Sequence, residues 1–258
     1  MNFDGMTFSI LGPAFIAGLL VLATHVPLGQ EVLKRGIIFI DLAIAQIAGM
    51  GVILANYLGW QAHGWEVQLA AMTSALIGAW ILSLMEKFWA TIQEALIGVT
   101  FILSATASIL LLANSPQGGE HLKELLVGQI LWVTWDQLIP LALMTIAILV
   151  AWFKFRQHFK RMGFYLIFAM AVTSSVQLVG VYLVFASLII PALASKNFKS
   201  KPALITGYTI GILGYGLGLM FSSIIDLPSG AVIVWSITII ALISLVIPKR
   251  NLIRYQKT

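Results

Sequence analysis

The chain has 258 residues, of which 60% are hydrophobic and 10% are charged, and its formal net charge is +5. Ordinary soluble domains carry about 25% charged residues and keep wet helix faces, so this composition excludes a soluble protein with one core. The chain contains no cysteine, which excludes disulfides, cysteine metal sites and cysteine nucleophiles. The basic residues lie in short clusters between apolar stretches, a pattern that favours membrane topology over nucleic-acid binding.

Apolar stretches long enough to cross a bilayer recur along the whole chain. A helix of roughly 20 apolar residues crosses the ~30 Å hydrocarbon core. We therefore expect an all-α polytopic membrane protein with eight or nine transmembrane helices, forming a single integral membrane domain over 1–258. The first stretch lacks the basic residues that begin a signal peptide, so we expect a permanent span there. The expected spans are 7–24, 36–58, 67–85, 94–113, 138–153, 162–193, 204–225 and 231–248.

The stretch 162–193 is too long for one straight crossing. Thr173, Ser174 and Ser175 divide it near its middle, so we predict a tight hairpin or a broken helix at that point. If the chain turns back there, fourteen of its fifteen Lys and Arg residues fall on one side of the membrane, with Lys123 opposite. The positive-inside rule makes the basic side cytoplasmic, which predicts an outside N-terminus and an inside C-terminus.

The longest outside loop is then 114–137. Its second half, Leu125 to Trp135, is amphiphilic and rich in Trp. Trp prefers the membrane–water interface, so we expect a short interfacial helix in this half.

Asp41 is the ionisable residue that lies well inside a span, about a turn and a half into the second one. Gln46 follows in the same span, and Gly49 and Gly51 would let another helix or a ligand approach closely. One interpretation is a site on a substrate path; the other is that Asp41 caps a half-helix or pairs with Arg35. Asp41 and Gln46 are ~140° apart around an ideal helix, which argues against a simple two-ligand site built from this pair.

Other polar residues have weaker functional interpretations. Glu94 opens the fourth span and is a second candidate for the path, although a carboxylate in a first turn also stabilises the helix dipole. Asp226 fits a turn in its Asp-Leu-Pro-Ser-Gly context. The histidines fall in or beside loops without helical metal-ligand spacing, so we expect no dedicated structural metal site from His25, His63, His121 and His158.

Two features bear on energy supply. The chain has no GxxxxGK[ST] phosphate loop, so we do not expect it to hydrolyse ATP by that route. The segment 191–201 is short, rich in small residues and basic, and it follows an apolar run on the predicted cytoplasmic side. It either docks a soluble partner or serves only as a positive-inside anchor.

Four segments together resemble the membrane subunits of zinc/manganese-type ABC transporters. The sequences VQLVGVYLVFASLIIPALAS (176–195) and LMFSSIIDLPSGAVIVW (219–235) are similar to two signature stretches of that family. The sequences EALIGVTFILSATASILLL (94–112) and KRGIIFIDLAIAQIAGMGVILANYLG (34–59) resemble two of its spans. These segments occur in the family's order and spread over most of the chain.

The resemblance implies an importer for a divalent metal, zinc or manganese, in the plasma membrane (the bacterial inner membrane). Its partners would be a second permease copy, cytoplasmic ABC ATPases, an external solute-binding protein and membrane lipid, with no nucleic acid. ATP would be used by the partner ATPase, and this chain would bind no cofactor of its own. The implied translocation path lies at the dimer axis and is lined by the second span, with Asp41, Gln46, Gly49 and Gly51, together with Glu94. The implied ATPase-coupling residues are Pro191, Ser195, Lys196, Phe198 and Lys199.

The second span departs from the family's pattern. The family carries an Asp and a His four residues apart on one helix face, and alignment on Gly51 places Leu42 and Gln46 at those two positions. Met50 replaces the family's Pro, and Asp41 stands one residue early. A Gln amide oxygen is a weaker, neutral ligand, and Zn²⁺ prefers nitrogen and sulfur. Asp41 and Gln46 remain the candidate metal ligands, and the cargo is either a metal passed without a tight intramembrane site, or another metal or a metal complex.

Two rival functions fit the sequence less well. A stand-alone secondary transporter or channel would be expected to have internal inverted repeats and several midplane charges, and the sequence has neither. An intramembrane enzyme would need a nucleophile–base pair or a metal constellation inside the bilayer, and the predicted spans contain no such group.

Overall fold

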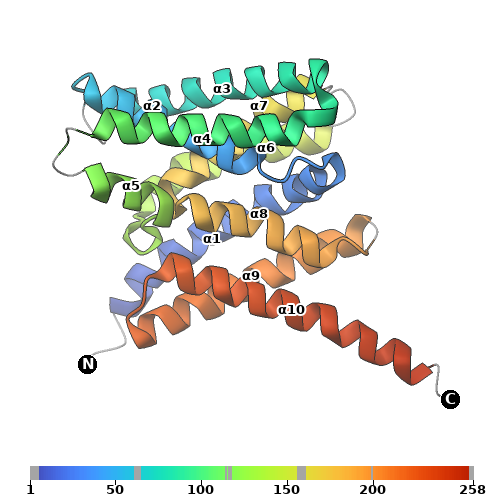
Figure 1. The fold of residues 1–258 in the computed structure, drawn as a ribbon. Coiled ribbons are helices and arrows are strands. Elements are labelled where there is room, and N and C mark those ends of the chain that lie inside the picture. Colours follow the sequence, from blue (N-terminus) through green and yellow to red (C-terminus); the bar gives the residue numbers. More distant parts are fainter. Residues whose placement is uncertain are drawn as a thin grey trace.

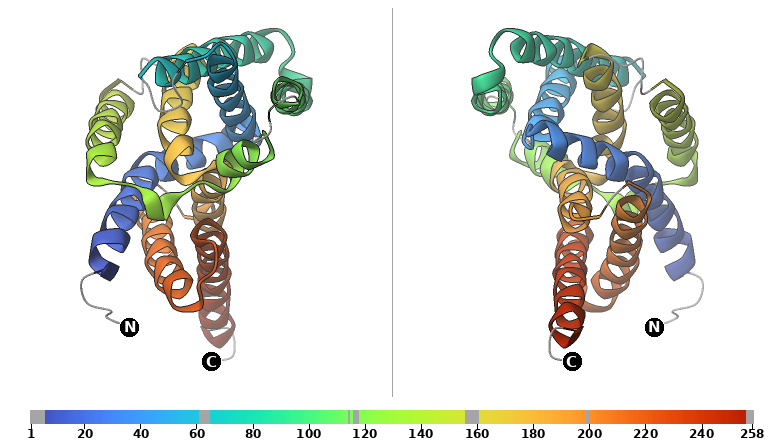
Figure 2. Two further views of the ribbon diagram at one scale, coloured as in Figure 1. Left: turned by 90° about the vertical axis from the view of Figure 1, so that its left-hand side faces the viewer. Right: turned by 90° about the vertical axis from the view of Figure 1, so that its right-hand side faces the viewer.

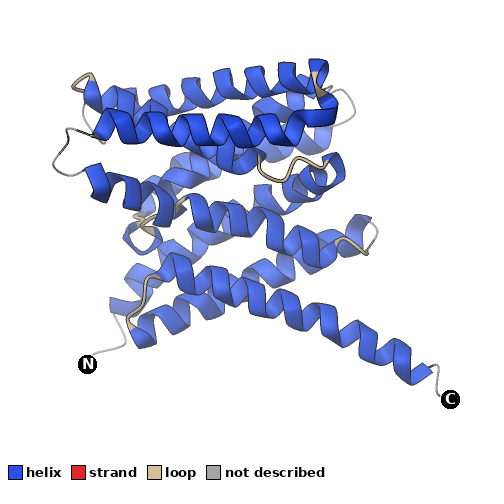
Figure 3. Ribbon diagram, in the orientation of Figure 1, coloured by secondary structure: helices blue, strands red, loops and turns tan. Residues whose placement is uncertain are grey.

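The computed structural model of the protein describes residues 6–60, 65–113, 115, 118–155, 161–198 and 200–255. The described residues form helices and no strand (Figure 3). The α-helices are α1 (Met6–Arg35), α2 (Ile40–Tyr57), α3 (Trp65–Phe88), α4 (Gln93–Leu112), α5 (Gly118–Val127), α6 (Trp135–Phe155), α7 (Arg161–Val179), α8 (Val181–Ser195), α9 (Ser200–Ile225) and α10 (Ser229–Tyr255), with short 3₁₀ turns η1 (Ala90–Ile92) and η2 (Ile130–Trp132).

Eight of the described helices are long and apolar enough to cross a membrane. They are α1, α2, α3, α4 with its preceding turn, α6, α7, α9 and α10. The apolar helix α8 has 15 residues and is shorter than a usual span. The prediction of an all-α polytopic protein with eight or nine membrane helices is therefore confirmed.

The helices pack as two groups around a buried centre (Figure 1). In one group α2 packs against α3, α4 and α7, and α7 packs against α3 and α6. In the other, α8 packs against α1, α9 and α10. An end-on view places α4 and α6 on opposite sides, with α2 and α7 between them (Figure 2). The centrally placed α2 and α7 are accordingly the most buried of the long spans.

The long apolar stretch 162–193 does turn back, but at a different residue from the predicted one. The break is at Gly180, which separates α7 from α8 with φ of +83°, and Figure 1 shows the two helices running in opposite directions. Thr173, Ser174 and Ser175 lie inside α7 instead. The Ser174 hydroxyl donates back to the carbonyls of Met170 and Ala171, so the helix accommodates this polar residue without breaking.

The turn at Gly180 is fixed by a backbone contact with Gly128, which follows α5. Both glycines have positive φ, and a Cβ added to either one would overlap the backbone of the other. A Cβ on Gly230 would come within 2.8 Å of the Val127 carbonyl oxygen, so α10 closes on the same turn. Glycine fits here because it adopts positive φ without strain and lets two backbones meet.

The α7–α8 reversal gathers the described basic residues at one end of the bundle. The C-terminal ends of α1, α3, α6 and α8 and the start of α7 lie at the right of Figure 1 and carry Lys34, Arg35, Lys87, Lys154, Lys196 and Arg161. Lys123 lies on α5, at the other end. This arrangement agrees with the charge asymmetry on which the predicted topology depends.

Helix α1 extends further than the first predicted span, which ended at residue 24. It continues through Pro27 to Arg35 because Val26, Leu28 and Val32 are buried in the core. His25 was expected in or beside a loop, but it is fully buried within this helix, with Nδ1 2.9 Å from the Val21 carbonyl oxygen.

The outside loop also differs in detail. Its α-helix, α5, covers Gly118–Val127 and so includes only the first three residues of the predicted half from Leu125 to Trp135. The turn at Gly128 follows this helix, and the short turn η2 then precedes α6. His63 and His158 lie outside the described residues.

We predict that Gly180→Ala destabilises the protein strongly, because a Cβ at this positive φ is strained and overlaps the Gly128 backbone. The strained backbone alone costs about 1–3 kcal/mol. Thermal melting of the purified protein in detergent measures the effect. Gly98→Ala is the matched control, because its Cβ meets nothing within 4 Å, and it should leave the melting temperature unchanged or higher. Equal melting temperatures for the two variants would contradict the role given to the contact.

Candidate functional site

Helix α2 presents a neutral stripe along its less covered side. Most of its residues are buried, but Leu42, Gln46 and Met50 are only partly buried. Their spacing of four residues places them on one face, one turn above another. The stripe therefore offers one amide and one thioether group, and no charge.

Asp41 lies on another face of α2 and points into the protein. It is 0% exposed, and neither carboxylate oxygen has a hydrogen-bond partner among the described residues. The structure shows neither an ion pair of Asp41 with Arg35 nor a cap made by its side chain. Arg35 pairs with Glu31 at 3.3 Å, and no side-chain hydrogen bond caps α2. Because α2 is a continuous helix, Asp41 and Gln46 keep the ~140° separation and do not converge as a pair of metal ligands.

The other predicted path residues make contacts within the bundle. A Cβ on Gly51 would lie 2.8 Å from the Ala70 carbonyl oxygen, so this glycine lets α3 approach α2. Gly49 faces Leu125 of α5 at an ordinary contact distance of 3.5 Å. Glu94 lies in the first turn of α4 and accepts a hydrogen bond from the Phe39 amide at 3.2 Å, which ties α4 to the start of α2. No group of three or more His, Cys, Asp or Glu residues that could hold a metal occurs within the described ranges.

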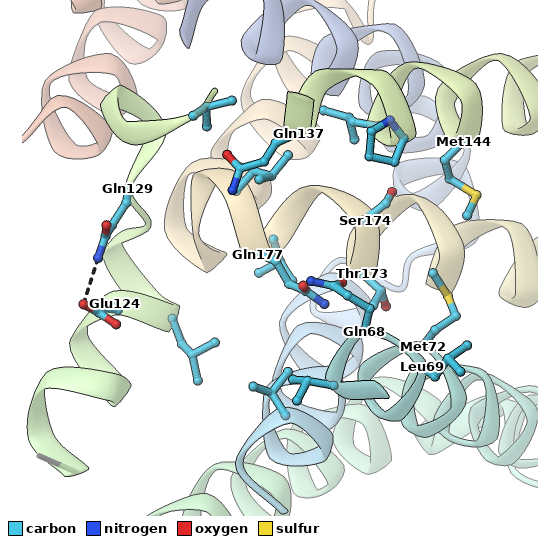
Figure 4. A pocket seen from close by; sticks show the side chains of 18 of the residues that line it. Gln68, Leu69, Met72, Glu124, Gln129, Gln137, Met144, Thr173, Ser174 and Gln177 are labelled. Carbon is cyan, nitrogen blue, oxygen red and sulfur yellow. Dashed lines mark hydrogen bonds between the residues drawn. The ribbon is translucent and has the colours of Figure 1, made fainter. Parts of the chain in front are cut away.

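A pocket of about 710 Å³ lies at the end of the bundle opposite the basic clusters. It is bounded by the ends of α2 and α7, the starts of α3 and α6, and α5. Figure 4 shows Gln68, Thr173 and Gln177 gathered at its centre, with Gln137 on the wall formed by α6. Thioethers of Met72 and Met144 and the side chain of Trp132 complete a lining that mixes neutral polar and apolar groups.

The polar groups of this pocket are not all satisfied. Thr173 is 1% exposed, and its hydroxyl has no hydrogen-bond partner among the described residues. The amide oxygen of Asn56 is also buried without a partner in that part of the chain. Glu124 is the charged member of the lining, and Gln129 donates to it at 2.8 Å. The pocket thus offers hydrogen-bonding capacity with little charge.

The predicted coupling residues lie at the other end of the protein, where α8 stops. Pro191 and Ser195 are buried, and Gln30 of α1 donates to the Ser195 hydroxyl at 3.5 Å. Lys196 and Phe198 are exposed, with Phe198 at 44%. Lys199 lies outside the described residues. The described part of the segment therefore presents an exposed cation and an exposed aromatic ring beside a buried hydroxyl anchor.

A cluster of charged and aromatic side chains ties helices together at this same end. Arg161 pairs with Glu86 of α3 at 3.2 Å, and the Arg35 guanidinium lies 4.2 Å from the centre of the Phe164 ring. Gln93 donates to the Tyr165 hydroxyl. These contacts link the ends of α1, α3, α4 and α7.

Comparisons with known proteins agree on one family. The sequence profile described as "ABC 3 transport family" matches residues 7–165 and 157–248. The chain is similar to the manganese transport system membrane protein MntC of Bacillus subtilis (27% identity, covering 92% of this chain), although the aligned region spans only 61% of that relative's length. It is also similar to MntC of Listeria monocytogenes (24% identity, 98% of this chain and 96% of the relative). A solved structure of PsaBC from Streptococcus pneumoniae in complex with Fab shares the fold, with a TM-score of 0.77, 22% identity and 96% coverage of both chains.

We predict that Gly51→Ala and Gly49→Ala have different effects on stability, because Gly51 packs closely against α3 and Gly49 makes only an ordinary contact. Gly51→Ala should lower the melting temperature, because its Cβ approaches a backbone oxygen of α3 too closely. Gly49→Ala should be neutral or stabilising, because Ala in a helix interior gains about 0.5–1 kcal/mol over Gly where space allows. Thermal melting of both variants checks the order of stability. A stable Gly51→Ala protein would refute the packing assignment.

Proposed function

We propose, from the premise that this chain belongs to the ABC 3 transport family, that it is the permease subunit of an ATP-driven importer of a divalent metal, manganese or zinc. The observation that carries the proposal is the family match, which extends over nearly the whole chain. The two MntC relatives are named as manganese transport proteins, which supports manganese as the first cargo to test.

The energy for transport comes from a partner in this proposal. The sequence contains no phosphate-binding loop, so cytoplasmic ATPases would bind and hydrolyse ATP. They would dock at the end of α8, where Lys196 and Phe198 are exposed. A second permease copy would complete the path, and an external binding protein would deliver cargo to the opposite end. The basic end of the bundle, with the C-terminus, then faces the cytoplasm, as the positive-inside rule requires.

Asp41 is the residue that we assign to the transport cycle itself. A buried carboxylate without a partner costs free energy, and such a residue inside a membrane segment is a functional candidate. Because Asp41 lies in the first turn of α2, it would stand at the cytoplasmic end of the proposed path. The conformation that opens toward the cytoplasm would expose it to the leaving cargo.

We predict that Lys196→Glu combined with Lys199→Glu weakens recruitment of the ATPase without affecting membrane insertion. Charge reversal changes an interface by about 1 kcal/mol, so co-purification of a co-expressed partner ATPase should fall by about fivefold. Lys123→Glu, at the opposite end of the protein, is the control and should behave as wild type. If ATPase recovery is unchanged in the double variant, the segment is only a membrane anchor.

We predict that Asp41→Asn abolishes metal uptake while the complex still assembles. The substitution keeps size and shape and removes the charge, so uptake of radioactive manganese in a deletion strain should fall by about tenfold or more, equivalent to at least about 1.4 kcal/mol. Asp136→Asn, an exposed position in the first turn of α6, is the matched control. Wild-type uptake by Asp41→Asn would remove this carboxylate from the mechanism.

A further inference from the structure

We propose that the pocket among α2, α3, α5, α6 and α7 binds the cargo as an uncharged metal complex with a completed coordination shell, whose outer surface donates hydrogen bonds. The inference rests on the proposed function and refines it, because it names the chemical form in which the metal reaches the permease.

The unpartnered oxygens of the pocket are the first observation. Thr173 is 1% exposed and Asn56 is partly buried, and neither the Thr173 hydroxyl nor the Asn56 amide oxygen has a partner among the described residues. A buried polar atom without a hydrogen bond costs stability, and two such atoms on residues that line one pocket call for an explanation. A ligand that donates N–H or O–H groups would satisfy both.

The remaining lining completes the description of that ligand. The carboxamides of Gln68 and Gln177 lie beside Thr173 at the pocket centre (Figure 4), and each can both donate and accept. They would meet the carboxylate or carbonyl oxygens of an organic shell, while Met72 and Met144 would contact its apolar parts. The volume of about 710 Å³ suits a small organic complex.

The electrostatics of the pocket disfavour a bare divalent ion. Hard divalent ions such as Mn²⁺ are held by carboxylates with carbonyls or water, and Zn²⁺ prefers nitrogen and sulfur ligands. The charged lining residue, Glu124, is exposed and already accepts a hydrogen bond from Gln129. A doubly charged ion would lose its hydration and gain only neutral amide ligands, which costs free energy. A complex that carries its own ligands and no net charge avoids this desolvation cost.

Equilibrium binding to the full-length permease in lipid nanodiscs tests the proposal. Radioactive zinc is supplied in two forms, as the uncharged bis(histidinato)zinc complex and as the buffered free ion. We expect saturable binding of the complex to the wild-type protein and at least tenfold weaker binding of the free ion. Thr173→Val and Gln177→Leu should each weaken binding of the complex by about tenfold, the loss expected when a ligand's hydrogen-bonding partners are removed.

Stability measurements show whether a variant loses binding because it loses a pocket group or because it unfolds. Thr173→Val removes an unsatisfied buried hydroxyl at constant shape, so the ligand-free variant should melt at or above the wild-type temperature. The control is Thr209→Val, because the exposed Thr209 hydroxyl donates to the Ile205 carbonyl of its own helix, and this variant should bind like wild type. Absence of binding of the complex, binding that Thr173→Val retains, or tighter binding of the free ion would each overturn the proposal.

Failure of this inference can be distinguished from failure of the proposed function. Uptake that requires the ATPase but is indifferent to Thr173→Val and Gln177→Leu would leave the importer intact and refute the complex as cargo. Loss of ATPase association from the wild-type protein would refute the importer, whatever the pocket binds.

Discussion

The architecture depends on one backbone contact, that between Gly128 and Gly180. The membrane provides no water to hydrogen-bond an open turn, so a chain that reverses within it must satisfy its backbone against protein. Here the α5–η2 turn packs directly on the α7–α8 break, and α10 closes on the same turn at Gly230. Two glycines with positive φ make that approach possible. Because α8 runs back toward the basic end, the exposed segment after Ser195 lies at the same end of the bundle as the end of α1 and the start of α7 (Figure 1).

A second constraint is the scarcity of charge within the spans. In a low-dielectric interior an isolated charge costs free energy, so most buried polar groups are neutral, and several of them bond to their own helix, as Ser108 and Ser187 do. Asp41 and the unpartnered oxygens of Thr173 and Asn56 depart from that rule. These three side chains lie at two places, the start of α2 and the pocket at the other end of the bundle, and His25 Nε2 within α1 is a further buried atom without a partner among the described residues.

Much of this arrangement was predictable from the sequence, and the misses have physical causes. Hydropathy gave the spans because length and apolar composition are local properties. The ~140° separation of Asp41 and Gln46 followed from helix geometry alone. The break was misplaced because hydroxyl residues in the middle of a long span resemble an interruption, whereas the Ser174 side chain bonds within the helix and the true turn needs Gly128, a partner 52 residues away. The pocket gave no sequence signal, since Gln68, Gln137 and Gln177 come from three different helices and meet only when these pack together.

The α7–α8 pair connects the two ends mechanically. Thr173 and Gln177 lie on the last turns of α7, with Thr173 about 9 Å before its end at 1.5 Å per residue. Gly180 follows at once, and the short helix α8 then runs to Ser195, where Gln30 holds it to α1. A partner that pulls on the exposed residues after Ser195 would act on a helix of 15 residues whose other end adjoins the pocket wall. The glycine contact keeps that end fixed relative to α5 and α10. Under the proposed function, movement at the end of α8 would either rotate α8 about Gly180 or separate Gly180 from Gly128, and either change would alter the wall that carries Thr173 and Gln177.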